Sequence, residues 1–121
     1  MKCACKGDFL DRFIQPSILL LLNSESMHGF SIYKRLQDSD IMDYSGIDPT
    51  GLYRTLKKME DAGLLTSQWD TDTASQARRI YTITGDGRHC LINWSDTLIS
   101  YKNSLENLAN AIIDSLKETT E

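Results

Sequence analysis

The sequence predicts a mainly α-helical fold with a small β-hairpin, in the order helix, helix, helix, hairpin, helix. Apolar residues recur at helical spacing in three short segments before residue 63. Thr, Ile, Tyr and Trp then gather in two segments that flank a polar stretch, and a long helical pattern closes the chain. With 121 residues, 40% of them hydrophobic, the chain fits one domain with a compact core, and a domain of this size gains stability from a partner subunit.

The first two helices follow a polar N-terminal segment. Pro16 lies in the first turn of the first helix, where proline is accepted, and "SILLLL" then continues a helix that is apolar nearly all round. We expect this helix to be central to the core. The polar stretch "NSESMHG" ends it, and "FSIYKRLQD" predicts a second, amphipathic helix. Its apolar positions are Phe30, Tyr33 and Leu36, and its outward positions are Lys34 and Arg35.

The third helix has the clearest boundaries. Asp48 is the expected N-cap, Pro49 occupies the first helical position, and Gly63 closes the helix. At about 100° per residue its apolar positions fall on one side: Leu52, Leu56 and Met59. The opposite side carries Thr50, Tyr53, Arg54, Lys57 and Asp61. This helix therefore buries one face and offers a basic, aromatic one.

A hairpin and a long helix complete the chain. The segments "LLTSQWD" and "ARRIYTIT" predict two antiparallel strands around a tip at "TDTASQ", and Gly85 and Gly87 are expected to end the second strand. A helix then begins near Asp86. Its apolar residues alternate in steps of three and four, which predicts a seam that pairs with another copy of the chain. The predicted dimerisation residues are Leu91, Trp94, Leu98, Tyr101, Leu105, Leu108 and Ile112.

Composition limits the cellular setting. The longest apolar run, residues 18 to 22, is far shorter than the roughly 20 residues that a membrane-spanning helix needs. Charged residues interrupt the N-terminus where a secretory signal requires an unbroken apolar core. We therefore expect a cytoplasmic protein with no membrane contact.

Three cysteines, an odd number, fit a reducing compartment better than a disulfide framework. Cys3, Cys5 and Cys90, with His28 or His89, could in principle form a soft-metal or redox site, because thiolates favour such metals. The spacing lacks a second Cys-x-x-Cys pair or a close histidine. We therefore assign no metal and no cofactor, and interpret the segment as a flexible arm with incidental thiols. A metal or redox site is the alternative.

The net charge of −4 argues against a polyanionic partner, but the charges are unevenly spread. Residues 50 to 59 carry Arg54, Lys57 and Lys58 with no acid, whereas residues 89 to 121 hold two lysines against five acids. A local basic face can therefore coexist with an acidic remainder, and the local field decides binding.

The order of elements is that of a winged helix-turn-helix, and specific stretches agree. "HGFSIYKRL", "GLYRTLKKMEDAGLL" and "RRIYTIT" resemble the PadR family of bacterial transcriptional regulators, over residues 16 to about 110. Two features depart from the family pattern: Arg54 stands where members commonly have proline, and "ASQA" replaces a Gly-Arg-Pro-type wing. The single closing helix resembles the short-tailed branch. The predicted organisation is an N-terminal arm (1–15) that can include a short helix, a winged helix-turn-helix (16–85) and a C-terminal dimerisation helix (86–121).

The third helix is the right size for the major groove of B-form DNA, where basic side chains exchange counterions for phosphate contacts. The predicted DNA-binding residues are Lys34, Thr50, Tyr53, Arg54, Lys57, Arg78 and Arg79, with Arg35 as a further flanking contact. Strand alternation makes one of Arg78 and Arg79 an ion-pair partner inside the fold. Tyr53 has half-buried packing as its alternative role, and Trp69 is expected to pack against the wing or the first helix. A solvated face is the alternative for the basic residues.

The resemblance also implies an effector, often a planar aromatic molecule, near the dimer interface. Trp94 is the candidate contact, and plain interface packing is its alternative. We expect a dimeric DNA-binding transcriptional regulator, a ligand-responsive repressor on an inverted-repeat operator. The alternative is a winged-helix module that binds a partner protein and no DNA. An enzyme is not expected, because no nucleophile with a base, glycine-rich phosphate loop or supported acid pair is present.

Overall fold

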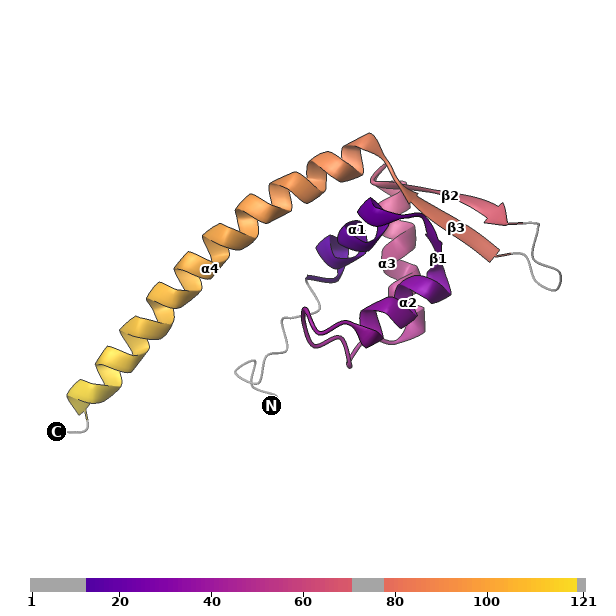
Figure 1. Ribbon diagram of the computed structural model, residues 1–121. Helices are drawn as coiled ribbons and strands as arrows, with labels where there is room; N and C mark the ends of the chain where they lie inside the picture. The colour runs from indigo at the N-terminus through magenta and orange to yellow at the C-terminus, as the bar shows by residue number, and fades with distance from the viewer. Residues whose placement is uncertain (1–12, 71–77, 120–121) are drawn as a thin grey trace. The chain divides into compact units, whose positions relative to one another are not determined.

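The structure is a computed structural model that describes residues 13–70 and 78–119 (Figure 1). The chain divides into two compact units, Met1–Leu91 and Ile92–Glu121. The elements are α1 (Ile14–Ser24), β1 (Met27–His28), α2 (Gly29–Asp38), α3 (Pro49–Asp61), β2 (Leu65–Asp70), β3 (Arg78–Ile83) and α4 (Gly85–Thr119). The predicted order of helices and hairpin is confirmed, with one added strand. The predicted hairpin tip and most of the N-terminal arm lie outside the described residues.

The three strands form one antiparallel sheet in the order β1-β3-β2. In the hairpin, Leu65 lies opposite Ile83 and Asp70 lies opposite Arg78. The added strand β1 pairs Met27 with Tyr81 on the other edge of β3. It falls inside "NSESMHG", which the sequence predicts only as a break between helices, because two residues are too short to show an alternating pattern.

The core of the first unit lies between the helices and one face of the sheet. Ile18, Leu19 and Leu22 of α1 are buried, which confirms that the first helix is central. The only polar side chain in the buried group of the described residues, Ser17, is satisfied: its hydroxyl donates to the Phe13 carbonyl at 2.7 Å and lies 2.8 Å from the Tyr44 hydroxyl.

Two aromatic residues of the first unit are more than half exposed. Phe30 of α2 is 56% exposed, which corrects its predicted apolar position, because the helix turns Ile32 and Leu36 into the core instead. Local spacing does not fix the rotation of a short helix. Trp69 of β2 is 57% exposed, and its ring contacts Arg79 of the neighbouring strand, which agrees with the prediction that it packs against the wing.

The turn after α3 places the hairpin beside that helix. Gly63 has φ +81°, the left-handed conformation that glycine adopts at little cost, and the Leu64 N–H donates to the Met59 carbonyl at 3.0 Å. Thr84 then caps α4: its hydroxyl donates to the Gly63 carbonyl at 2.7 Å and accepts from the Gly87 N–H at 3.0 Å. Gly85 and Gly87 therefore lie in the first turn of α4, just after β3 ends at Ile83, which agrees with the predicted helix start near Asp86.

The second unit is described up to Thr119 and consists of α4 residues alone. Apolar residues stand exposed along it, including Leu98, Tyr101, Leu105, Leu108 and Ile112. Leu91 and Trp94 are half-buried. None of the helices among the described residues is long and apolar enough to cross a membrane.

Candidate nucleic-acid interface

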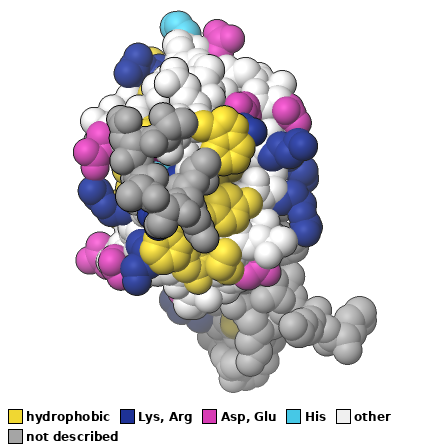
Figure 2. All heavy atoms as spheres, turned by 90° about the vertical axis from the view of Figure 1, so that its right-hand side faces the viewer, with side chains coloured by type: hydrophobic (Ala, Val, Ile, Leu, Met, Phe, Trp, Pro, Cys, Tyr) yellow, Lys and Arg dark blue, Asp and Glu magenta, His cyan; other side chains and the backbone are white. Residues whose placement is uncertain are grey.

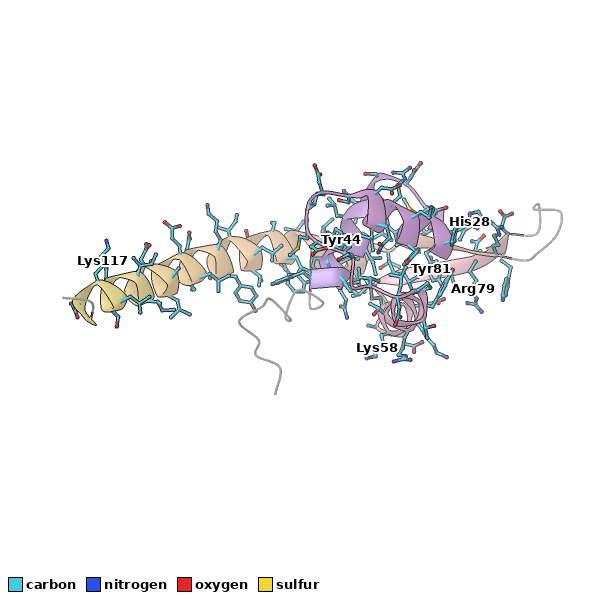
Figure 3. The ribbon with its side chains drawn as sticks, turned by 90° about the horizontal axis from the view of Figure 1, so that it is seen from below. His28, Tyr44, Lys58, Arg79, Tyr81 and Lys117 are labelled. Carbon is cyan, nitrogen blue, oxygen red and sulfur yellow. The ribbon has the colours of Figure 1, made fainter. Side chains whose placement is uncertain are left out.

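The position of α3 is fixed at its start and along one side. The Asp48 carboxylate accepts a hydrogen bond from the Gly51 N–H, and Pro49 follows as the first helical residue, as predicted. Leu52, Leu56 and Met59 are 1%, 0% and 1% exposed. Because one side is anchored in the core, the other must face solvent, and Figure 3 shows Lys58 pointing away from the body of the unit. The predicted contacts on α3 are all exposed: Thr50, Tyr53, Arg54 and Lys57.

Tyr53 also packs inside the unit. A Cβ atom at Gly29 would lie 2.5 Å from Tyr53 Cε1, so the ring covers the first turn of α2. The Tyr53 side chain is nevertheless 44% exposed. The packing that the sequence offers as one role of Tyr53 is therefore present, and the rest of the ring remains accessible to solvent.

The two wing arginines differ in their surroundings. Arg79 donates to the Ser67 hydroxyl at 2.9 Å, lies 3.8 Å from a Glu60 carboxylate oxygen, and stacks over the Trp69 ring at 4.7 Å from its centroid. The Ser67 hydroxyl in turn donates to Glu60 at 2.7 Å. This chain of contacts joins α3, β2 and β3. Arg79 is thus held by partners within the unit, whereas Arg78, also exposed, has none among the described residues.

The charges on α2 are peripheral. Lys34 is exposed. Arg35 donates to Glu25 at 2.8 Å, and both side chains are more than half exposed, at 58% and 57%. Such a surface pair contributes little stability, so Arg35 can exchange Glu25 for an anionic partner. Lys34 is accessible to such a partner as well.

A cavity of about 480 Å³ opens between the N-terminus of α2, α3 and the wing. Its lining residues are His28, Gly29, Phe30, Tyr53, Trp69, Arg78, Arg79 and Tyr81. His28 Nε2 lies 3.0 Å from an Asp70 carboxylate oxygen, which ties the start of α2 to the end of β2. Burial raises the pKa of Tyr81 above its ordinary value, and the Glu60 carboxylate adds to the rise while Arg79 opposes it. Sequence reasoning missed this cavity because its walls come from four separate segments.

The metal alternative gains no support from the described part of the chain. No group of three His, Cys, Asp or Glu side chains there could hold a metal ion. Cys90 is half-buried and has a free thiol, while Cys3 and Cys5 lie outside the described residues. The candidate effector contact, Trp94, belongs to the second unit.

Comparison with known proteins identifies the chain. The sequence model of the PadR-like family of transcriptional regulators matches residues 18–93. The chain belongs to this family. PadR-like proteins are transcriptional regulators and not enzymes, and the resemblance noted in the sequence is confirmed. No protein of curated function matches the sequence.

Solved structures share the fold of this PadR-like chain. A conserved protein of unknown function, TM0937, a potential transcriptional factor, is 31% identical with a TM-score of 0.71, over 90% of this chain and 95% of its own. A PadR family regulator from Clostridium difficile R20291 is 21% identical with a TM-score of 0.68, over 79% and 97%. Bacillus subtilis PadR in complex with operator DNA is 24% identical with a TM-score of 0.61; the match covers 69% of this chain and 46% of that one.

Proposed function

We propose that this PadR-like regulator binds double-stranded DNA as a homodimer, with α3 in the major groove and the wing at the adjacent minor groove. The observation that carries the proposal is the anchoring of α3, which leaves Arg54, Lys57 and Thr50 on its solvent side. Basic side chains on a rigid helix fit the size and charge of the groove. The DNA complex of Bacillus subtilis PadR shows that a protein of this fold binds operator DNA.

The apolar side of α4 supports the homodimer. Leu98, Leu105 and Leu108 are exposed within the chain, and a contiguous apolar stripe of this kind marks an interaction surface. Its steps of three and four suit pairing with a second α4, with residues 86–121 acting as the dimerisation helix. A two-fold dimer matches an inverted-repeat operator, whose half-sites one helical turn apart require the two recognition helices to stand about 34–36 Å apart.

We further propose that the regulator represses transcription and responds to a ligand. A bound dimer would act as a repressor in the cytoplasm by covering its operator. A planar aromatic effector stacked on Trp94 would alter the angle between paired α4 helices and move the recognition helices out of register. Plain packing of Trp94 in the dimer core is the alternative, and it predicts that aromatic ligands leave DNA affinity unchanged.

Salt-dependent DNA binding tests the proposal. Fluorescence anisotropy with DNA from upstream of the gene should show steep salt dependence, and Arg54→Ala plus Lys57→Ala should lower the slope of log K against log salt by about four, because the dimer loses two cations from each protomer. The matched control, Arg88→Ala plus Lys102→Ala, removes one Arg and one Lys from α4 instead. A double variant that binds like the control contradicts the role of α3. Wild-type protein that binds neither upstream nor random DNA indicates the protein-interaction module.

A further inference from the structure

We infer that the cavity between α2, α3 and the wing, here called the aromatic pocket, holds a sugar–phosphate segment of bound DNA, with Phe30 and Trp69 as additional DNA contacts. The inference rests on the proposed function and deepens it. Neither residue belongs to the predicted interface, and both are exposed where sequence patterns place them in packed positions. The eight lining residues given above define the pocket.

The geometry of the DNA grooves indicates which part of the duplex would lie in the aromatic pocket. The major and minor grooves of B-form DNA are separated by a sugar–phosphate backbone. A protein that places α3 in one groove and its wing in the neighbouring groove must therefore accommodate that backbone between the two elements. The aromatic pocket fits this position, because residues of both elements line it: Tyr53 of α3, and Arg78 and Arg79 of the wing.

The chemistry of the walls fits such a segment. The Arg78 side chain has no hydrogen bond or ion pair with another described residue, so its guanidinium is available for a phosphate. Deoxyribose presents apolar C–H surface, which aromatic rings can cover. Figure 2 shows large hydrophobic side chains gathered on the face at this end of the unit, with Lys and Arg side chains beside them. Water-exposed aromatic rings next to cations are the arrangement that a sugar–phosphate chain requires.

The stack of Arg79 on Trp69 gives the pocket a defined shape. The guanidinium lies 4.7 Å from the ring centroid and also donates to Ser67. Figure 3 labels Arg79, Tyr81 and His28, which come from the wing and from the start of α2. Because internal partners hold Arg79, the wall exists before DNA arrives and little side-chain freedom is lost on binding.

Salt titrations separate sugar contacts from phosphate contacts. Anisotropy is measured with a mixed-sequence duplex of about three helical turns. Phe30→Ala and Trp69→Ala should each weaken binding by about threefold to tenfold for each protomer, and so by about tenfold to a hundredfold for the dimer, and leave the salt slope unchanged. Arg78→Ala should lower the slope by about two, one for each protomer. Ile41→Ala is the control, since Ile41 is 64% exposed and lies outside the pocket; it should bind like the wild type.

Tryptophan fluorescence tests occupancy directly. The chain has two tryptophans, so the Trp94→Phe variant reports on Trp69 alone, with its own DNA binding measured alongside. Saturating DNA should remove most of the acrylamide quenching of Trp69. If this variant binds DNA but Trp69 stays equally accessible, or if Phe30→Ala and Trp69→Ala bind like Ile41→Ala, the inference is overturned.

Protection of Trp69 on raising the protein concentration without DNA assigns the pocket to a second copy of the chain and also overturns it. Failure of wild-type protein to bind any DNA instead refutes the proposed function itself. The two failures are therefore distinguishable.

Discussion

Replacement of Gly87 by alanine should destabilise the protein, because the start of α4 packs closely on the turn after α3. Gly87 is buried in the first turn of α4. A Cβ atom there would lie 2.7 Å from Ile83 Cγ1 and closer still to the carbonyl oxygen of Leu64. That oxygen accepts a hydrogen bond from the Thr84 N–H at 3.1 Å. The clash is therefore with fixed backbone, which cannot rotate away as a side chain can.

Two opposing terms set the magnitude. Overpacking of this kind costs about 1–3 kcal/mol, and a backbone obstacle favours the upper part, about 2–3 kcal/mol. Alanine in place of glycine inside a helix stabilises the folded state by about 1 kcal/mol. The net expectation for Gly87→Ala is a loss of about 1–2 kcal/mol in the free energy of unfolding. At about 4–8 °C per kcal/mol for a domain of this size, the melting temperature should fall by about 5–15 °C.

Gly85 provides the matched control. It lies two residues earlier in the same helix, and a Cβ atom there meets nothing within 4 Å. Gly85→Ala should therefore stabilise the protein by up to about 1 kcal/mol. Urea unfolding followed by circular dichroism measures both variants at one fixed protein concentration, because dimerisation couples stability to concentration. Equal stability of the two variants, or a gain for Gly87→Ala, would refute the close approach and the reasoning built on it.

Three further predictions concern single contacts. Asp48→Ala removes the side-chain cap of α3 and should lower the free energy of unfolding by about 1 kcal/mol, whereas Asp48→Asn should retain most of it. Gly29→Ala should lower the free energy of unfolding more in the wild type than in a Tyr53→Ala background, because the Tyr53 ring occupies the space that the new methyl group needs. An equal loss of stability in both backgrounds of this double-mutant cycle would contradict the contact. The raised pKa of Tyr81 predicts stability that is complete below about pH 10, the unfolded pKa, and lost as pH rises through the folded pKa. Tyr81→Phe should show a shallower alkaline loss in unfolding experiments, and Glu60→Gln should lower the pKa of Tyr81 in an absorbance titration.

The third helix could be predicted almost completely because its determinants are local. A cap at Asp48, proline at the next position, and Gly63 at the end are read within a few residues of the backbone they control. The apolar stripe at Leu52, Leu56 and Met59 follows from helical periodicity alone. Each signal acts over less than two turns, so no knowledge of the rest of the chain was needed.

The wing pairing could have been found from the sequence with one further step. Leu65 pairs with Ile83 and Trp69 pairs with Arg79, so paired residues lie at equal distances in sequence from residue 74. Centring the hairpin there places Trp69 beside Arg79, and this was the available signal for their stacking. Without the register, Trp69 read as an ordinary packing residue.

Other features had no local signal. The strand β1 forms because Met27 and His28 meet β3, more than fifty residues later in the chain, in the register Met27 with Tyr81. Phe30 is exposed because α2 turns Ile32 and Leu36 into the core, and the Tyr53 ring, from a separate helix, lies over Gly29 at the start of α2. These arrangements arise from tertiary contacts between distant segments, which short-range spacing does not encode.

The contacts of Glu60 reduce the positive charge that the proposed DNA interface offers. Arg79 and Ser67 both engage Glu60, so the end of α3 and both wing strands are linked as one body. Recognition helix and wing should then meet DNA at a fixed separation. The same contacts neutralise part of the Arg79 charge before DNA arrives. Strand alternation predicts that one of the two wing arginines is an internal ion-pair partner; the structure gives that place to Arg79 and leaves the Arg78 side chain with no partner among the described residues. Arg78→Ala should therefore reduce the salt dependence of DNA binding more than Arg79→Ala, while Arg79→Ala should cost more in stability.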